Sequence, residues 1–332
     1  MSKLFIGNKE YPSTHVDRLE PLRTTSVVMD FIFCNPYIGT HSSTQPMAHV
    51  TNSHADEILD KEFKCLNTGF VRLIDYMGGD ESIVQAARVS YGKGTKTVNE
   101  DRGLIRYLMR HLHTTPFEMV ELKFHVKLPI FVARQWIRHR TANVNEYSGR
   151  YSVMKDEFYV PEHEAIHYQS VRNKQGRREE DVPPELRQKV MDILSSSQQQ
   201  LYGEYEQLLE SDIARELARI NLPLSLYTEW YWKIDLHNLF HFLRLRMDEH
   251  AQYEIRVYGE AMAEITKCVA PMAWEAFEDY ILRSEKFSRL ELNILAANLD
   301  MSMFTKEYLE SKGLGKREAE EFLEKLHNLP KE

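Results

Sequence analysis

The sequence has little cysteine: Cys34, Cys65 and Cys268 are the only three in 332 residues. They stand far apart and show no C-x-x-C spacing, so neither a disulfide framework nor a thiolate zinc site is predicted. None lies in an electropositive segment, so nothing favours a cysteine nucleophile. His49 and His54 lack a supporting cluster of ligands, and we predict no metal site. These features favour a reducing, cytoplasmic environment.

Long apolar runs are also absent. No segment approaches the ~20 apolar residues that span a bilayer, and the N-terminus has no signal-peptide core. The formal net charge of -8 disfavours broad binding to a nucleic-acid backbone. The sequence contains no G-x-G-x-x-G, no G-x-x-x-x-G-K and no G-x-S-x-G. A dinucleotide-binding Rossmann unit, a P-loop and a serine-hydrolase elbow are therefore excluded, and we expect neither a membrane nor a nucleic-acid partner.

Between residues 134 and 151, basic, amide and aromatic side chains are concentrated in one connected segment. It contains four arginines, one histidine, two asparagines, three aromatic rings and a single carboxylate, Glu146. Arginine presents a planar fork of donors that matches phosphate, and aromatic faces and amides beside it suit a nucleotide. An isolated R-H-R is more often a solvated turn. The polar string that follows this one favours a nucleotide-binding segment.

The residues before this segment predict a strand followed by a helix. Apolar and charged residues alternate over 120–127, which predicts a strand with one buried and one wet face. Pro129 then opens a helix in which Trp136 turns inward and Gln135 shares a face with Arg138. Further predictions are a strand over 70–77, a helix over 80–89, a helix from 99 stopped by Pro116, and a returning strand over 158–160.

The second half of the sequence reads as largely helical. A polar insertion over 163–184 precedes an amphipathic helix over 185–210, whose apolar stripe is either core or a subunit contact. Ser211 is predicted to cap a short helix, and Asp235 a helix that extends past Ile265. Residues 284–332 are predicted to form two or three short amphipathic helices around Gly313 and Gly315, as a structural appendage.

The basic segment resembles the signature of the flavin-dependent thymidylate synthases, R-H-R-x-x-S-x-N-E-x-S-x-R. Arg138-His139-Arg140, Asn145, Glu146, Ser148 and Arg150 fall on this pattern, and Asn143 stands where the family usually has serine. The resemblance covers roughly residues 69–282. It continues through the following runs: His113-Thr114-Thr115-Pro116, Ala218-Arg219-Ile220, Leu222-Pro223-Leu224 and Arg246-x-Asp248-x-His250-Ala251-Gln252.

The resemblance implies an α/β (mixed α+β) fold with a central, mainly antiparallel sheet and long flanking helices. It implies an obligate homo-oligomer, a homotetramer with active sites at subunit junctions. It implies FAD, reduced by NADPH, and conversion of dUMP to dTMP with 5,10-methylenetetrahydrofolate as the one-carbon donor and tetrahydrofolate as the second product. The chain would then divide into an N-terminal extension (1–66), a catalytic domain (67–282) and a helical C-terminal extension (283–332).

The family's site residues can be carried over by position. The resemblance implies that Arg246 sits against the uracil ring as the catalytic cation, where a fixed positive charge favours the ionised ring and makes the neighbouring carbon more nucleophilic. His113 and Ser148 would line the folate side. The flavin contacts implied are Thr115, which reaches a neighbouring subunit's flavin, and Arg138, His139, Arg140, Glu146, Asp235, His237 and His241. The dUMP contacts implied are Gln135, Trp136, Ile137, Arg138, Glu146, Tyr147, Ser148, Gly149, Arg150, Arg219 and Arg246.

Two other functions remain open on the sequence alone. One is a nucleotide- or RNA-binding module that kept the pocket and lost the chemistry, although the acidic net charge argues against RNA. The other is an oxidoreductase on the same flavin scaffold with a different acceptor. Product formation from dUMP distinguishes the synthase from both.

Overall fold

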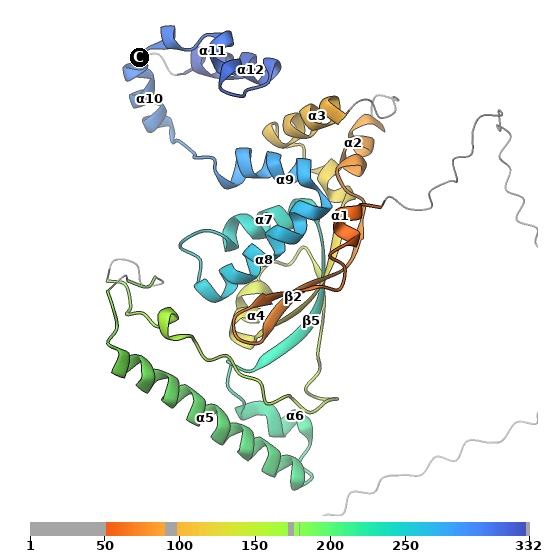
Figure 1. Ribbon diagram of the computed structural model, residues 1–332, viewed down its shortest axis with the longest axis vertical. Helices are drawn as coiled ribbons and strands as arrows, with labels where there is room; N and C mark the ends of the chain where they lie inside the picture. The colour runs from red at the N-terminus through yellow and green to blue at the C-terminus, as the bar shows by residue number, and fades with distance from the viewer. Residues whose placement is uncertain (1–50, 90–97, 172–175, 179, 330–332) are drawn as a thin grey trace, which may run out of the picture. The chain divides into compact units, whose positions relative to one another are not determined.

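The computed structural model describes residues 51–89, 98–171, 176–178 and 180–329. The first 50 residues, with Cys34 and His49, lie outside the described residues, as do residues 172–175 and 179 of the polar insertion. The described chain is a mixed α/β fold built around one five-stranded sheet (Figure 1). None of its described helices has the length and apolar character needed to cross a membrane.

The sheet is antiparallel throughout, which confirms the predicted type of sheet. Its strands run in the order β1-β2-β3-β5-β4. The central pair is β3 and β5, in register from Glu121 opposite Asp235 to Pro129 opposite Tyr227. The strands are β1 (Glu62–Cys65), β2 (Gly69–Met77), β3 (Glu121–Pro129), β4 (Asn143–Glu146) and β5 (Tyr227–Asp235).

Two strands differ from the sequence-based expectation. The returning strand predicted over 158–160 is wrong, because Phe158 forms only an isolated bridge to Leu226. The strand that pairs with β5 is β4, inside the polar segment, and all four of its residues are exposed. It has no buried face and therefore no hydrophobic alternation to detect. In β5, by contrast, Trp230 and Trp232 are buried on either side of exposed Tyr231, a period of two that the sequence did contain.

Several of the described helices pack against this sheet. The described helices are α1 (Ser53–Asp56), α2 (Asp80–Val89), α3 (Val98–Arg110), α4 (Ile130–Trp136), α5 (Pro184–Glu210), α6 (Arg215–Ala218), α7 (Leu236–Arg246), α8 (Tyr253–Val269), α9 (Pro271–Phe277), α10 (Arg289–Asn298), α11 (Lys306–Ser311) and α12 (Lys316–His327). Single turns follow as η1 (Thr115–Met119), η2 (His163–Ala165), η3 (Arg219–Asn221), η4 (Glu278–Leu282, of π type) and η5 (Met301–Met303).

Three helix predictions are corrected by the structure. The helix capped by Asp235 does not run past Ile265, because α7 ends at Arg246 and α8 begins only at Tyr253. Ser211 ends α5 instead of capping α6. Helix α3 ends at Arg110, well before Pro116, because Leu112 adopts a positive φ of 58° that an α-helix cannot continue.

The core lies between one face of the sheet and helices α4, α7 and α8 (Figure 1). Trp136, at the end of α4, is fully buried and its ring centroid lies 5.6 Å from Trp230, 5.3 Å from Trp232 and 4.7 Å from Phe242. The predicted inward position of Trp136 is thus confirmed.

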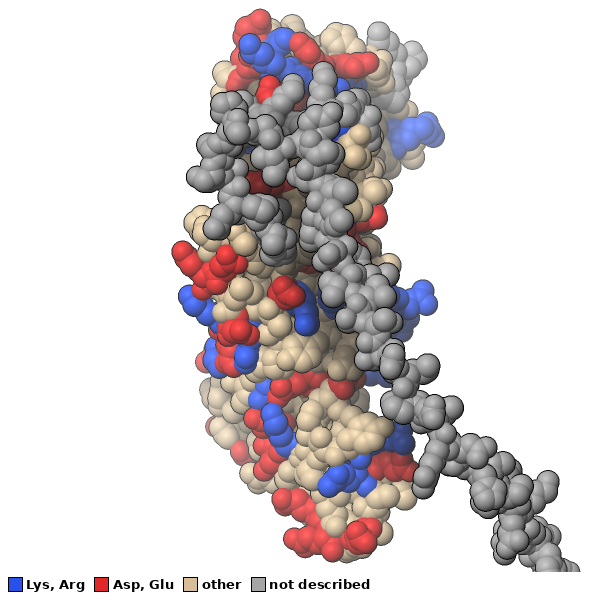
Figure 2. Space-filling model, turned by 90° about the vertical axis from the view of Figure 1, so that its right-hand side faces the viewer, with Lys and Arg blue, Asp and Glu red and all other residues tan. Residues whose placement is uncertain are grey.

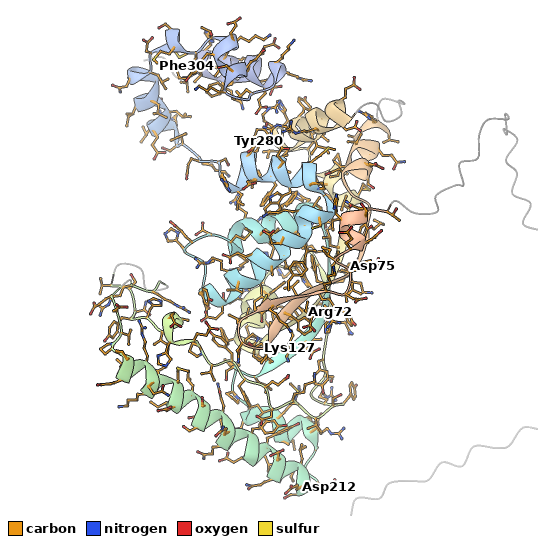
Figure 3. All side chains as sticks on the ribbon, in the orientation of Figure 1. Arg72, Asp75, Lys127, Asp212, Tyr280 and Phe304 are labelled. Carbon is orange, nitrogen blue, oxygen red and sulfur yellow. The ribbon has the colours of Figure 1, made fainter. Side chains whose placement is uncertain are left out.

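Ion pairs connect two strands of the sheet to nearby carboxylates. Arg72 of β2 pairs with Glu62, and Lys127 of β3 pairs with Glu157, at 2.8 Å each; Figure 3 labels both basic residues.

The C-terminal helices join the fold through charged contacts with α3. Arg106 and Arg110 of α3 pair with Glu318 and Glu321 of α12, at 3.4 and 2.7 Å. The prediction of short C-terminal helices separated around Gly313 and Gly315 is confirmed. Figure 2 shows basic and acidic side chains interspersed over the face that it draws.

Asp80 links α2 to the start of α9. Its carboxylate accepts hydrogen bonds from the main-chain N–H groups of Met272 at 2.8 Å and Ala273 at 2.9 Å. Burial raises the pKa of this carboxyl to about 6, although both hydrogen bonds favour the ionised form. Asp80 therefore satisfies two donors that helix α9 leaves free at its N-terminus.

We expect Asp80→Ala to lower the free energy of unfolding by about 2–4 kcal/mol, because two buried N–H groups lose their acceptor. Asp80→Asn keeps one acceptor oxygen and should lose less. Chemical denaturation of both variants against an exposed control, Glu81→Ala, measures the effect. Equal stability of Asp80→Ala and Glu81→Ala would contradict this role.

Candidate active site

The basic segment leaves the core directly after Trp136. Helix α4 is only seven residues long, and its last side chain is the buried Trp136. The chain then turns outward, so that Arg138 and Arg140 are exposed while His139 between them is half-buried. The fixed indole therefore determines where the R-H-R sequence begins on the surface.

His139 meets α7 at the centre of the site. Arg246 Nε donates a hydrogen bond to His139 Nε2 at 3.1 Å, and the His139 ring lies 4.9 Å from Phe242 and 5.9 Å from His241. An arginine Nε always carries its hydrogen, so His139 Nε2 must be the acceptor and the imidazole proton must sit on Nδ1. The structure thus brings together three of the residues predicted to bind flavin or substrate.

Burial and charge keep this cluster from taking a further proton. Burial, the charge of Arg246 and neighbouring His241 together lower the pKa of His139 to about 4. Burial also lowers the pKa of Arg246, yet a guanidinium starts so high that it remains charged at neutral pH. The pair therefore consists of a neutral imidazole and a partly desolvated cation.

A second group forms around Gly149. A Cβ atom at this position would lie 3.1 Å from Arg219 Nη1 and 2.7 Å from Met154 Sδ, so the arginine packs against the glycine backbone. Arg150 Nε lies 3.2 Å from an oxygen of Glu216, with both side chains more than half exposed. The structure thus places Arg219 of η3 beside residues 148–150, as the dUMP prediction requires.

Other residues predicted to bind the flavin or dUMP form hydrogen bonds within the protein. Glu146 Oε1 accepts from Thr228 Oγ1 at 2.8 Å, and Tyr147 donates to the Val153 carbonyl at 2.8 Å. Asp235 caps α7, accepting from the Asn238 N–H at 2.9 Å and from its side-chain amide at 2.7 Å. The Trp136 indole is enclosed in the core, so any contact from that residue to a ligand has to come from its main chain.

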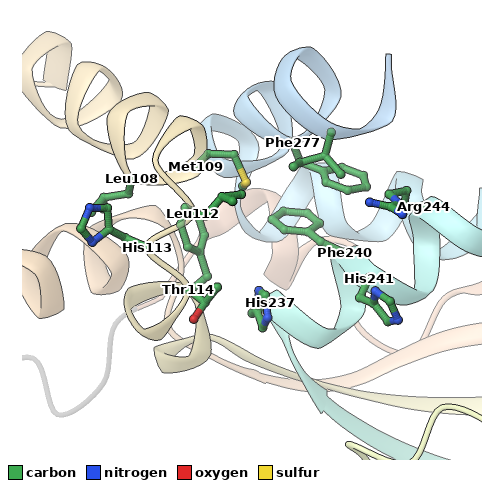
Figure 4. A pocket seen from close by; sticks show the side chains of 12 residues that line it. Leu108, Met109, Leu112, His113, Thr114, His237, Phe240, His241, Arg244 and Phe277 are labelled. Carbon is green, nitrogen blue, oxygen red and sulfur yellow. The ribbon is translucent and has the colours of Figure 1, made fainter. Parts of the chain in front are cut away.

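A cavity of about 180 Å³ opens beside His241, which belongs to the cluster around His139 (Figure 4). His113 and Thr114 line it from the corner before η1, and His237 and His241 line it from α7. Thr115 is exposed at the same corner and is not among the lining residues. Arg244, which sequence reasoning missed, also lines the cavity. Its spacing from His237 and His241, at i+7 and i+3, is the signal that could have identified it.

Several arginines of the site are left without a counter-charge inside the described chain. Among the described residues no carboxylate pairs with Arg138, Arg140, Arg219 or Arg246, whereas Arg150 has Glu216. Guanidinium forks without carboxylate partners are suited to phosphate oxygens. These guanidinium donors, together with the aromatic and imidazole rings beside them, fit a dinucleotide cofactor and a nucleoside monophosphate.

Metal or thiolate chemistry finds no support in the part of the chain that is described. No group of three or more His, Cys, Asp or Glu side chains suited to a metal ion occurs among those residues. Cys65 is buried, and burial raises the pKa of its thiol to about 12. Cys65 is therefore not a nucleophile at neutral pH.

Known proteins resemble this chain over most of its length. The family described as "Thymidylate synthase complementing protein" matches residues 72–272. A flavin-dependent thymidylate synthase of Rickettsia conorii is 54% identical over 85% of this chain and 98% of its own length. The enzyme of the same name from Treponema denticola is 59% identical over 81% of this chain and 98% of its own.

A solved structure also resembles the fold. It is a UMP/dUMP methylase from Streptomyces cacaoi bound with 5-Br UMP, with a TM-score of 0.60 and 34% identity. The similarity covers 65% of this chain and 96% of the methylase.

The lowered pKa of His139 gives a direct test of the site's electrostatics. The ordinary pKa of a histidine is 6.5, and that of His139 is about 4. We therefore expect the imidazole to stay neutral, with its proton on Nδ1, as the pH falls from 8 toward about 4. Because the unfolded chain binds this proton first, the group makes folding less favourable as pH falls through that window. Imidazole ¹⁵N NMR, with His139→Gln to assign the signal, measures the titration. A midpoint between 6 and 7 would show that neither burial nor Arg246 lowers the pKa of this ring.

Proposed function

This chain belongs to the flavin-dependent thymidylate synthase family, and from that membership we propose that it catalyses the reductive methylation of dUMP to dTMP. It is thus a flavin-dependent methyltransferase. The observation that carries the proposal within the molecule is the contact of Arg246 with His139. It joins the R-H-R segment to the residue predicted to hold the uracil.

Arg246 acts on the pyrimidine ring in this proposal. Its Nε is occupied by His139, which leaves the two Nη groups to face a ligand. Neutral His139 orients the guanidinium without competing for negative charge. A desolvated cation beside the uracil stabilises the ring anion and thereby raises the nucleophilicity of its C5 carbon.

The nucleotide phosphate is assigned to the second group of residues. Arg219 and Arg150 would hold it by paired hydrogen bonds, and Gly149 allows the chain to approach closely because it has no side chain. Ser148, Tyr147 and Glu146 stand beside them, and Gln135, Ile137 and the main chain of Trp136 complete the dUMP site.

The flavin is assigned to the R-H-R segment and to α7. Arg138 and Arg140 would bind the FAD diphosphate, while His139, Glu146, Asp235, His237 and His241 provide further contacts. When bound, FAD reduced by NADPH supplies the hydride that completes the methyl group. The one-carbon unit comes from 5,10-methylenetetrahydrofolate, with tetrahydrofolate released, and His113 and Ser148 line the folate side.

We further propose that the active protein is a homotetramer in the cytoplasm, with Thr115 contacting the flavin of a neighbouring subunit. The surface of α5 supports assembly, because only Gln198 and Tyr205 of its 27 residues are buried while Leu186, Ile193 and Leu208 are exposed. An apolar stripe on a long helix is usually covered by a partner.

The purified protein should be yellow, show a flavin absorption spectrum and oxidise NADPH in a reaction that depends on dUMP. Absorption spectroscopy measures the flavin and the oxidation of NADPH, and a tritium-release assay on dUMP labelled at C5 measures turnover. A colourless protein that does not bind added FAD would count against the proposal. Binding of dUMP without tritium release would favour a nucleotide-binding module.

Arg246→Ala should retain flavin and lose turnover by a factor on the order of 10²–10³, because the cation that stabilises the ring anion is removed. Flavin content and kcat of the variant are compared with those of Arg256→Ala, an arginine of α8 paired with Glu260. Unchanged kcat in Arg246→Ala would remove this residue from the mechanism.

A further inference from the structure

A buried carboxylate lies next to the proposed nucleotide site. Glu254, in the first turn of α8, has a side chain only 5% exposed. Its Oε1 accepts hydrogen bonds from Arg177 Nη2 at 2.5 Å and from the Tyr159 hydroxyl at 3.1 Å. Its Oε2 accepts from Gln252 Nε2 at 2.8 Å. A buried charge with three donors is stable as the carboxylate.

The charge state of Glu254 depends on Arg177. Burial alone would raise the pKa of this carboxyl, but the charge of Arg177 and the hydrogen bonds from the surrounding donors hold it below its ordinary value. Arg177 reaches Glu254 from the polar insertion, 77 residues earlier in the chain. The insertion thus supplies the cation that keeps a core carboxylate ionised.

An ionised carboxylate determines which way the two neighbouring amides face. It has no proton to donate, so Gln252 must turn its NH₂ group toward Glu254 and its oxygen away. That oxygen accepts a hydrogen bond from Gln135 Nε2. The Gln135 amide is therefore fixed as well, with its NH₂ group used and its Oε1 left as an acceptor that no described residue engages.

Gln135 stands on the last turn of α4, one turn before Arg138 and His139. We propose that Arg177 is a positioning residue for the nucleotide, acting through Glu254 and Gln252 to hold Gln135 Oε1 as a hydrogen-bond acceptor toward it. This inference rests on the proposed function. The group recognised is a hydrogen-bond donor of the nucleotide, and dUMP offers two, the ring N3–H and the sugar 3′-hydroxyl.

The polar insertion thereby acquires a role at the site. Without Arg177, Glu254 takes up a proton more readily and becomes able to donate, so Gln252 and Gln135 lose their fixed direction. Glu254→Gln has the same effect at nearly constant shape, because an amide can present either a donor or an acceptor to Gln252. Both changes alter nucleotide binding without touching the nucleotide.

The test compares Arg177→Ala and Glu254→Gln with the flavin-loaded wild-type protein. We expect KM and Kd for dUMP to rise about threefold to tenfold, the effect of one misdirected hydrogen bond, while kcat and flavin content stay unchanged. Arg177→Lys should restore part of the affinity, because it returns the cation. Arg178→Ala is the matched control: this arginine adjoins Arg177, is equally exposed, and pairs with Glu180 at 3.1 Å.

Two analogues identify the donor. N3-methyl dUMP lacks the ring donor, and 2′,3′-dideoxyuridine monophosphate lacks the sugar donor. The affinity loss caused by Arg177→Ala should disappear with one of them, since that analogue has nothing left for Gln135 Oε1 to bind. A loss that persists equally with both would overturn the proposal.

The remaining outcomes separate this inference from the function itself. If the wild type binds and methylates dUMP but Arg177→Ala and Glu254→Gln match Arg178→Ala, the positioning role is wrong and the synthase assignment stands. A fall in melting temperature and flavin content with an unchanged dUMP Kd would assign Arg177 a structural role only. A wild type that fails to bind dUMP would refute both proposals before any variant is made.

Discussion

Burial of the Trp136 indole is the constraint on which the site depends. Four aromatic rings, those of Trp230, Trp232, Phe242 and Tyr258, surround it between the sheet and the helices. A seven-residue helix has little stability of its own in water, so this packing is what holds α4 in place. Because the R-H-R sequence begins two residues later, the same packing fixes where it enters the site.

Two sets of arginines, those of α3 and those of the site, differ in their partners. Those of α3 are joined to carboxylates of α9, η4 and α12. Glu321 of α12 accepts from Arg110, from His111 and from Arg317. Their charges are used inside the fold. Those of the site, Arg138, Arg140, Arg219 and Arg246, have no such partner among the described residues. Arg246 is half-buried and the other three are exposed. Guanidinium groups without a carboxylate partner remain available for an anionic ligand.

Polar contacts also connect the site to parts of the chain outside the signature. The Arg177–Glu254–Gln252–Gln135 series begins in the insertion and ends on α4, and every step is fixed by which atoms can donate. The signature motifs do not reveal this series, because Arg177 and Glu254 lie outside them. The orientation of a neutral amide is decided by the nearest group that can only accept.

The sequence by itself determined the family, the antiparallel β3 strand, the position of α4 and the identity of the basic segment. These follow from local periodicity and from one spaced motif, both of which are properties of neighbouring residues. Only the tertiary structure decided that β4 lies within that motif, that α7 ends at Arg246, and that Arg246 meets His139. The β4–β5 pairing and the Arg246–His139 contact join residues far apart in the sequence. Their partners are selected by packing and hydrogen-bond geometry, which no local pattern records.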